Sequence, residues 1–237
     1  MQAGKLYLIP TTLGDNDPME VLPLSVKRIV ENTLYFIVEN EKSARRFIKK
    51  IAPEKEQSSL KLYVLDKRTD EIESKNYLDV CEDGHNVGLL SDAGVPAIAD
   101  PGALVVELAH NKNIRVVPLV GPSSILMAMM SSGLNGQNFC FNGYLPIDAG
   151  ERKKSLRNLE KISFQYNQSQ IFIETPYRNE KLLEDIIKNL SPTTRLCIAT
   201  DISLKNEFIR TLDIKNWKNT RKPNLHKRPT IFIIHKF

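Results

Sequence analysis

The chain has 237 residues, a formal net charge of +5, 41% hydrophobic residues and 26% charged residues. This composition is ordinary for a globular protein, and it excludes a low-complexity chain. No apolar run reaches the roughly 18 residues that a membrane span needs, so we expect no membrane contact. The three cysteines lie in apolar stretches and no Cys or His ligands are paired at zinc spacing, which predicts reduced thiols, no metal site and a cytoplasmic protein.

Apolar strand-like segments alternate with helical segments through the first half of the chain. The predicted strands are residues 5–9, 34–38, 61–65, 87–90 and 115–119. The predicted helices between them are residues 18–31, 42–51, 71–82 and 103–111. Apolar strands that alternate with amphipathic helices favour a largely parallel sheet covered on both faces.

The pattern changes after the Gly121-Pro122 turn. The predicted strands that follow are residues 139–144, 170–174, 195–200, 207–211 and 230–235. The predicted helices are residues 125–132, 151–161 and 177–189. Because some of these strands follow one another directly, we expect antiparallel pairs and a mixed sheet. The sequence therefore predicts an α/β protein with an N-terminal domain at 1–119 and a C-terminal domain at 123–237.

Several common nucleotide and hydrolase motifs are missing from the sequence. It contains no G-x-G-x-x-G, no G-x-x-x-x-G-K-[ST] and no G-x-S-x-G. These absences disfavour a dinucleotide-binding Rossmann site, a P-loop and a nucleophile elbow. What remains is a set of loops rich in Gly, Pro and Ser at strand ends, where open α/β sheets bind ligands. They read PTTLGDND, SDAGVPAIADPG, VGPSS, ETPYR and KRPT, and together they predict a ligand cleft between two domains.

These loops resemble, in this order, those of the tetrapyrrole (corrin/porphyrin) methylase superfamily. The resemblance spans nearly the whole chain, and within the superfamily it is strongest to the bacterial 16S rRNA ribose 2'-O-methyltransferases. The stretches that carry it are LYLIPTTLGD, LLSDAGVPAIADPG, VVPLVGPSSILMAMMSSGL, FCFNGYLP, GERKKSL, IFIETPYRNEKLLEDI and KNEFIRTL. The resemblance implies a two-domain fold, a homodimer and S-adenosylmethionine as methyl donor.

The same resemblance implies which residues contact the donor. They are Ile9, Pro10, Gly94, Ala97, Ile98, Ser123, Ser124, Ile125, Tyr144, Glu174, Thr175, Pro229 and Thr230. These residue types suit the ligand. Gly94 and Ala97 allow close approach of the backbone, and a serine at a helix N-terminus favours a carboxylate.

Basic residues cluster in three segments, and an RNA acceptor or a ribosomal small subunit would use them to bind phosphates. The candidates near the donor motifs are Arg152, Lys153, Arg157 and Arg178. The third cluster comprises Lys218, Arg221, Lys222, Lys227 and Arg228. A solvated surface is an equally good interpretation of each cluster.

The N-terminal motifs depart from the rRNA-methylating pattern. Where that branch carries A-E-D-T-R, this chain has VENEKSARR: Glu39 is kept, but Asn40, Glu41 and Lys42 replace the acid, the threonine and the arginine. A histidine-rich segment after the third strand is absent, and I-G-N in the first loop has become Leu13-Gly14-Asp15. The candidate general bases near the cleft are Glu39, Asp92, Asp100 and Glu174, and Glu39 is selected as the retained member of an altered motif. A small-molecule or protein acceptor, and a non-catalytic module that binds the donor or RNA, remain open alternatives.

Overall fold

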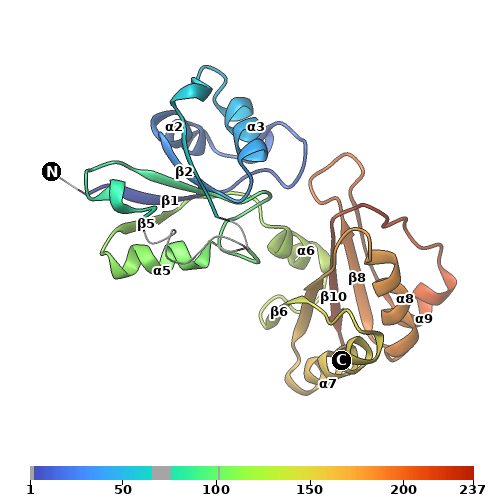
Figure 1. The fold of residues 1–237 in the computed structure, drawn as a ribbon. Helices are drawn as coiled ribbons and strands as arrows, with labels where there is room; N and C mark the ends of the chain where they lie inside the picture. The colour runs from blue at the N-terminus through green and yellow to red at the C-terminus, as the bar shows by residue number, and fades with distance from the viewer. Residues whose placement is uncertain (1–2, 66–75, 101) are drawn as a thin grey trace. The chain divides into compact units, whose positions relative to one another are not determined.

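The computed structural model describes residues 3–65, 76–100 and 102–237. The chain divides into two compact units, Met1–Ser123 and Ser124–Phe237, called unit 1 and unit 2 below (Figure 1). Within the described residues, no helix is both long enough and apolar enough to span a bilayer.

Unit 1 contains a five-stranded, fully parallel sheet in the order β3-β2-β4-β1-β5. Its strands are β1 (Lys5–Ile9), β2 (Tyr35–Val38), β3 (Lys61–Val64), β4 (Val87–Leu90) and β5 (Arg115–Pro118). Because all strands run in the same direction, the loops that follow them emerge at one edge of the sheet. This edge therefore carries the loops that begin at residues 10, 39, 91 and 119.

Helices cover both faces of this sheet (Figure 1). They are α1 (Pro18–Val21), α2 (Leu24–Asn32), α3 (Glu41–Ile51) and α5 (Ala103–Asn111), with short 3₁₀ turns η1 (Gln57–Ser59) and η2 (Asp79–Cys81). One core cluster joins α2 and α3 to the sheet through residues such as Val30, Ile48 and Phe36. A second cluster joins α5 to the opposite face through Val105, Ala109 and Leu89.

Unit 2 contains a five-stranded mixed sheet in the order β6-β7-β10-β8-β9. Its strands are β6 (Phe139–Tyr144), β7 (Ser169–Ile173), β8 (Arg195–Thr200), β9 (Phe208–Asp213) and β10 (Thr230–His235). The β6 and β7 strands pair in parallel, and the other three pairings are antiparallel. The parallel first sheet and the mixed second sheet confirm the predicted fold class.

The helices of unit 2 are α6 (Ser124–Ser132), α7 (Ala149–Tyr166), α8 (Asn179–Asn189) and α9 (Ile214–Asn219). The α7, α8 and α9 helices share one core cluster with the sheet, in which Leu156, Ile186 and Trp217 are buried. The α6 helix packs against β8, β9 and β10, and the Thr211 hydroxyl donates to the Ser132 carbonyl at 2.7 Å.

The structure differs from the predicted elements at three places. The single helix expected at 18–31 is split into α1 and α2, because Pro23 lacks an N–H group and ends the first segment. Much of the helix expected at 71–82 lies outside the described residues, and the part that is described forms turns and η2. The α9 helix was not expected from its six residues, although its buried Trp217 anchors it.

Candidate functional site

In unit 1, hydrogen bonds join the loops that follow β1 and β4. The Thr11 N–H donates to the Gly94 carbonyl at 2.8 Å, and the Thr11 hydroxyl donates to the Ser91 carbonyl at 3.3 Å. The Ser91 hydroxyl donates to the same Gly94 carbonyl at 3.2 Å. These bonds fix the position of the SDAG turn beside Pro10.

The backbone of the 91–102 loop takes left-handed conformations at three small residues, with φ of 79° at Gly94, 66° at Ala97 and 65° at Ala99. An Asp100 oxygen accepts hydrogen bonds from the N–H groups of Ala97 at 2.7 Å and Gly102 at 2.9 Å. Burial raises the pKa of the Asp100 carboxyl, and these two backbone donors oppose that rise. Asp100 therefore organises the loop.

The loops after β1 and β5 lie in direct contact. A Cβ atom on Gly121 would lie 2.2 Å from Cγ of Pro10, so only glycine fits there. The side chains of Ile98 and Val120 are 52% and 76% exposed at this same edge of the sheet. The structure thus brings together Pro10, Gly94, Ala97 and Ile98, while Ser123 ends the neighbouring 119–123 loop.

The predicted donor residues of unit 1 fit the group that they are expected to hold. Exposed aliphatic side chains suit an adenine ring, and left-handed alanines leave backbone groups accessible to a ligand. Ile9 is fully buried, so only its backbone can take part.

A second group of unit 1 side chains surrounds Glu39. Asn40 caps α3, and the Ser43 hydroxyl donates to Oδ1 of Asp92 at 2.5 Å. The Asp92 N–H donates to Oε1 of Glu39 at 3.1 Å, so the carboxylate is held at the end of β2. A cavity of about 310 Å³ opens beside this group, lined by Thr11, Thr12, Leu13, Gly14, Asp15, Ser43, Arg46, Phe47, Lys50 and Asp92.

This cavity is lined by one of the chain's departures from the rRNA-methylating pattern, the first loop at residues 12–15. Residues 12–15 and Ser43 line it, and Glu39 is hydrogen-bonded to its wall at Asp92. Lys50 forms an ion pair with Asp15, and this hydrogen bond and charge lower the pKa of the Asp15 carboxyl. The charge of Lys50 is therefore paired, and Arg46 is the cation of this wall that suits an anionic acceptor.

In unit 2, the predicted donor residues lie at one edge of the mixed sheet. The parallel strands β6 and β7 end there at Tyr144 and Ile173, and the antiparallel β10 begins there at Thr230. The Tyr144 side chain is 58% exposed. The edge therefore brings together Tyr144, Glu174, Thr175, Pro229 and Thr230, whereas Ser124 and Ile125 begin α6.

Hydrogen bonds within unit 2 define what the residues at this edge can offer a ligand. The buried Glu174 carboxylate accepts from the Thr175 N–H and from Nη2 of Arg178, both at 2.6 Å. The Thr230 hydroxyl donates to Oγ1 of Thr200 at 2.9 Å. Nε of Arg178 is buried without a hydrogen-bond partner among the described residues. Among these residues, the exposed Tyr144 side chain is the group that a ligand at this edge could contact.

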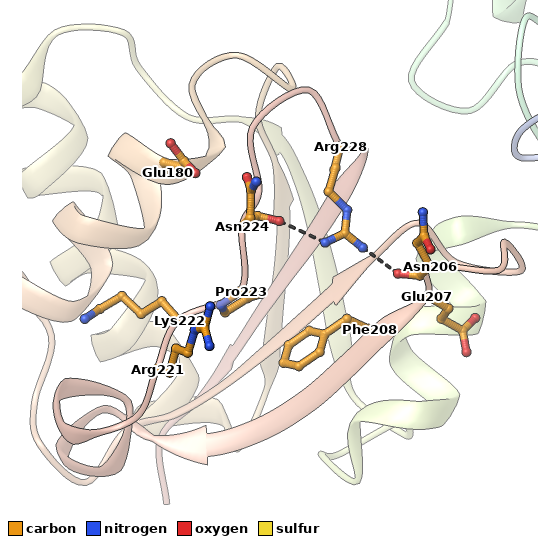
Figure 2. A pocket seen from close by; sticks show the side chains of 9 residues that line it. All are labelled: Glu180, Asn206, Glu207, Phe208, Arg221, Lys222, Pro223, Asn224 and Arg228. Atoms are coloured by element: carbon orange, nitrogen blue, oxygen red, sulfur yellow. Dashed lines mark hydrogen bonds between the residues drawn. The ribbon is translucent and has the colours of Figure 1, made fainter.

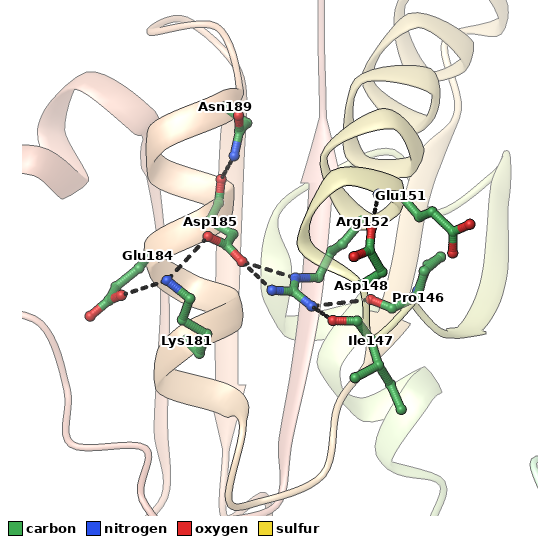
Figure 3. Close-up of polar contacts among 9 residues, drawn as sticks. All are labelled: Pro146, Ile147, Asp148, Glu151, Arg152, Lys181, Glu184, Asp185 and Asn189. Atoms are coloured by element: carbon green, nitrogen blue, oxygen red, sulfur yellow. Dashed lines mark hydrogen bonds and ion pairs between the residues drawn. The ribbon is translucent and has the colours of Figure 1, made fainter.

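The predicted phosphate-binding residues do not form one surface. Arg152 is only 6% exposed, and its guanidinium binds Asp185 and the carbonyls of Pro146 and Ile147 (Figure 3). A phosphate contact at Arg152 would therefore require breaking a buried ion pair. The neighbouring Lys153 and Arg157 are exposed on α7.

No group of three or more His, Cys, Asp or Glu side chains in the described parts of the chain is arranged to hold a metal ion.

The sequence belongs to a recognised family. Residues 5–216 match the tetrapyrrole (corrin/porphyrin) methylases. Among curated relatives, the protein named ribosomal RNA small subunit methyltransferase I from Buchnera aphidicola subsp. Schizaphis graminum (strain Sg) is 27% identical, over 100% of this chain and 80% of its own length. The protein of the same name from Escherichia coli O157:H7 is 28% identical, over 87% of this chain and 68% of its own length.

Solved structures share the fold at low sequence identity. The methyltransferase CobJ has a TM-score of 0.63 and 15% identity, covering 99% of this chain and 95% of its own. The uroporphyrin-III C-methyltransferase from Thermus thermophilus, complexed with S-adenosylhomocysteine, has a TM-score of 0.55 and 16% identity, covering 98% of each chain. The chain therefore belongs to the tetrapyrrole (corrin/porphyrin) methylase family and is a methyltransferase that uses S-adenosylmethionine.

Proposed function

We propose that this enzyme methylates ribosomal RNA of the small subunit, at a ribose 2'-hydroxyl. The observation that carries the proposal is the match of nearly the whole chain to relatives named for methylation of small-subunit rRNA. The basic side chains Arg46, Lys153 and Arg157 supply positive charge for a phosphate backbone. An rRNA acceptor also places the enzyme in the cytoplasm, where ribosomal subunits are made.

The residues of unit 1 suggest how the acceptor hydroxyl is activated. S-adenosylmethionine, when bound, supplies an electrophilic methyl group. A ribose hydroxyl is a weak nucleophile, so a nearby carboxylate that accepts its proton accelerates transfer. Glu39 suits this task, because the Asp92 N–H holds Oε1 and so orients the carboxylate. Arg46, which lines the adjoining cavity, would orient an acceptor phosphate.

We also propose that the enzyme is a homodimer. The α6 helix carries Leu126 and Met130, which are four residues apart and therefore share a helix face, and both are strongly exposed in the single chain. A second copy of the chain would cover them. Sedimentation of the wild type and of a Met130→Glu variant tests this proposal. We expect the wild type to be a dimer and the variant to dimerise more weakly. A monomeric wild type would contradict the proposal.

The decisive test of function is transfer of an isotope-labelled methyl group from S-adenosylmethionine. The acceptors are small ribosomal subunits from a bacterium whose own relative has been deleted and, separately, an RNA-free cell extract. We expect label in the rRNA at one ribose. Label confined to the RNA-free fraction would contradict the proposal and assign a protein or small-molecule acceptor. Donor binding measured by calorimetry on the same sample confirms that the protein used is competent.

A further inference from the structure

Unit 2 contains an open groove that the proposed reaction does not use. Its volume is about 860 Å³. Three segments form it: the first turn of α8, the loop that leads into β9, and the chain between α9 and β10 (Figure 2). The lining residues are Glu180, Asn206, Glu207, Phe208, Arg221, Lys222, Pro223, Asn224 and Arg228.

Arg228 holds the two walls of this groove together. Its guanidinium donates to the Asn224 carbonyl at 2.9 Å on one wall and to the Asn206 carbonyl on the other (Figure 2). Its Nε also donates to Oδ2 of Asp201 at 2.6 Å, so its charge is paired. The groove is therefore a fixed feature of unit 2, and the charge of Arg228 is not offered to a ligand.

The floor of the groove is aromatic. Phe208 packs partly against the core of unit 2, and it also lines the groove. Figure 2 shows Arg221, Lys222 and Pro223 on one side of the Phe208 ring, with Asn206 on the other. An aromatic ring fixed on a core and open to a groove is a stacking surface for a nucleobase.

The chain around the groove is strongly basic. Residues 205–228 include eight Lys and Arg and only two Asp and Glu. Arg221 and Lys222 are exposed, and both line the groove. Two cations beside an aromatic floor provide the combination that binds single-stranded nucleic acid, in which backbone charges are neutralised and bases stack.

We propose that this groove, defined by Phe208, Arg221 and Lys222, binds a single-stranded segment of the RNA acceptor outside the site of methyl transfer. The inference rests on the proposed function, since it assumes an RNA acceptor. A base stacks on Phe208, and the adjoining phosphates contact Arg221 and Lys222. The groove also contains Glu180 and Glu207, whose carboxylates can accept hydrogen bonds from base amino groups.

The test compares two variants with a matched control. Arg221→Gln combined with Lys222→Gln removes the two groove cations, whereas Phe208→Leu keeps an apolar side chain against the core and removes the ring. The control combines Arg115→Gln with Lys61→Gln. These two exposed residues begin β5 and β3, at the edge of the unit 1 sheet opposite its ligand-binding loops. Binding of a fluorescein-labelled single-stranded RNA that spans the mapped acceptor is measured by anisotropy at several salt concentrations.

We expect the double Gln variant to bind RNA about tenfold more weakly. Its log–log salt slope should fall by about 1.4, since each phosphate contact on a single strand contributes about 0.7. Phe208→Leu should also bind about tenfold more weakly with an unchanged salt slope, because stacking releases no counterions. The control should match the wild type, and all variants should bind S-adenosylmethionine normally.

Four results would overturn the inference. If the wild type methylates RNA and both groove variants bind RNA as it does, the groove assignment fails and the proposed function stands. If the control loses as much affinity as the double Gln variant, the effect reflects net charge alone. If the groove variants bind naked RNA normally but fail to methylate whole subunits, the groove binds a ribosomal protein. A wild type that neither binds nor methylates RNA would remove the proposed function and this inference together.

Discussion

Arg152 and Asp185 form a buried ion pair that joins α7 to α8. Nε and Nη2 of Arg152 lie 2.9 Å and 2.5 Å from the same oxygen, Oδ2 of Asp185 (Figure 3). The carbonyls of Pro146 and Ile147 accept the remaining hydrogen bonds of this guanidinium. A residue expected to meet a phosphate therefore stabilises the packing of two helices.

Arg152→Ala should consequently destabilise unit 2. Removing Arg152 leaves the Asp185 carboxylate with only a longer ion pair, to Nζ of Lys181 at 3.6 Å, and breaking a buried pair in this way costs up to about 3–5 kcal/mol of unfolding free energy. The single tryptophan, Trp217, is buried in unit 2, so urea titration followed by its fluorescence reports on this unit. The exposed neighbour Lys153 gives the control, because Lys153→Ala should change stability by less than about 0.5 kcal/mol. Equal stability of the two variants would contradict the structural role of Arg152.

Gly121→Ala should weaken binding of the methyl donor by at least about tenfold. The added Cβ would overlap Pro10, and this forces apart two loops that are predicted to contact the donor. Gly136→Ala is the matched control, since a Cβ there meets no atom within 4 Å. Calorimetry with S-adenosylmethionine measures the effect. Wild-type affinity in Gly121→Ala would show that the 10–17 and 119–123 loops do not hold the donor.

Glu39→Gln should lower kcat by about 10²–10⁴-fold and leave donor affinity unchanged, as expected for loss of a general base. Glu41→Gln is the control, because Glu41 lies two residues away and pairs with Arg45 on the surface of α3. If Glu39→Gln retains the wild-type rate, Glu39 does not accept the proton.

Asp100→Asn should remove a pH dependence from the stability of unit 1. The folded pKa of Asp100 is raised above its usual 3.8, so the folded state binds this proton more tightly than the unfolded state does. The carboxyl's contribution to stability is therefore greatest below pH 3.8 and falls as the pH rises through the raised value. Asparagine keeps an oxygen acceptor for the Ala97 and Gly102 N–H groups but carries no charge.

Urea unfolding followed by circular dichroism between acid and neutral pH tests this expectation. The unfolding free energy of Asp100→Asn relative to the wild type should increase with pH. Parallel curves for the two proteins would contradict it. Asp100→Ala, which loses both acceptor contacts, should be less stable than Asp100→Asn by about 1–3 kcal/mol at every pH.

The order of strands and helices is largely predictable from this sequence, because alternating apolar strands and amphipathic helices leave a strong periodic signal. The residues at which helices begin and end are harder to predict. Pro23 lies inside an otherwise continuous helical pattern, and its missing N–H decides the break locally. The short α9 helix depends on burial of Trp217, a tertiary contact that a six-residue window does not reveal.

In the candidate site, too, some features could be predicted from the sequence and others could not. Loops at the ends of parallel strands must meet, so the gathering of Pro10, Gly94 and the 119–123 loop follows from strand direction alone. The charge of Arg152 suggests an exposed side chain, but its spacing from neighbouring apolar residues of α7 indicates that it is buried. Arg152, Leu156 and Leu159 lie four and three residues apart, which places the arginine on the buried face of α7. Its partner Asp185 is 33 residues away and only the fold brings it near.

The position of β10 has a consequence for how the protein is made on the ribosome. This strand, residues 230–235, lies between β7 and β8 and pairs with both. The strands of unit 1 all precede residue 119, so that unit can fold during translation, while unit 2 cannot join the two halves of its sheet until residue 235 has left the exit tunnel. A nonsense codon between residues 214 and 229 would therefore leave two unpaired strand edges, on β7 and β8, in a chain whose first unit is already complete.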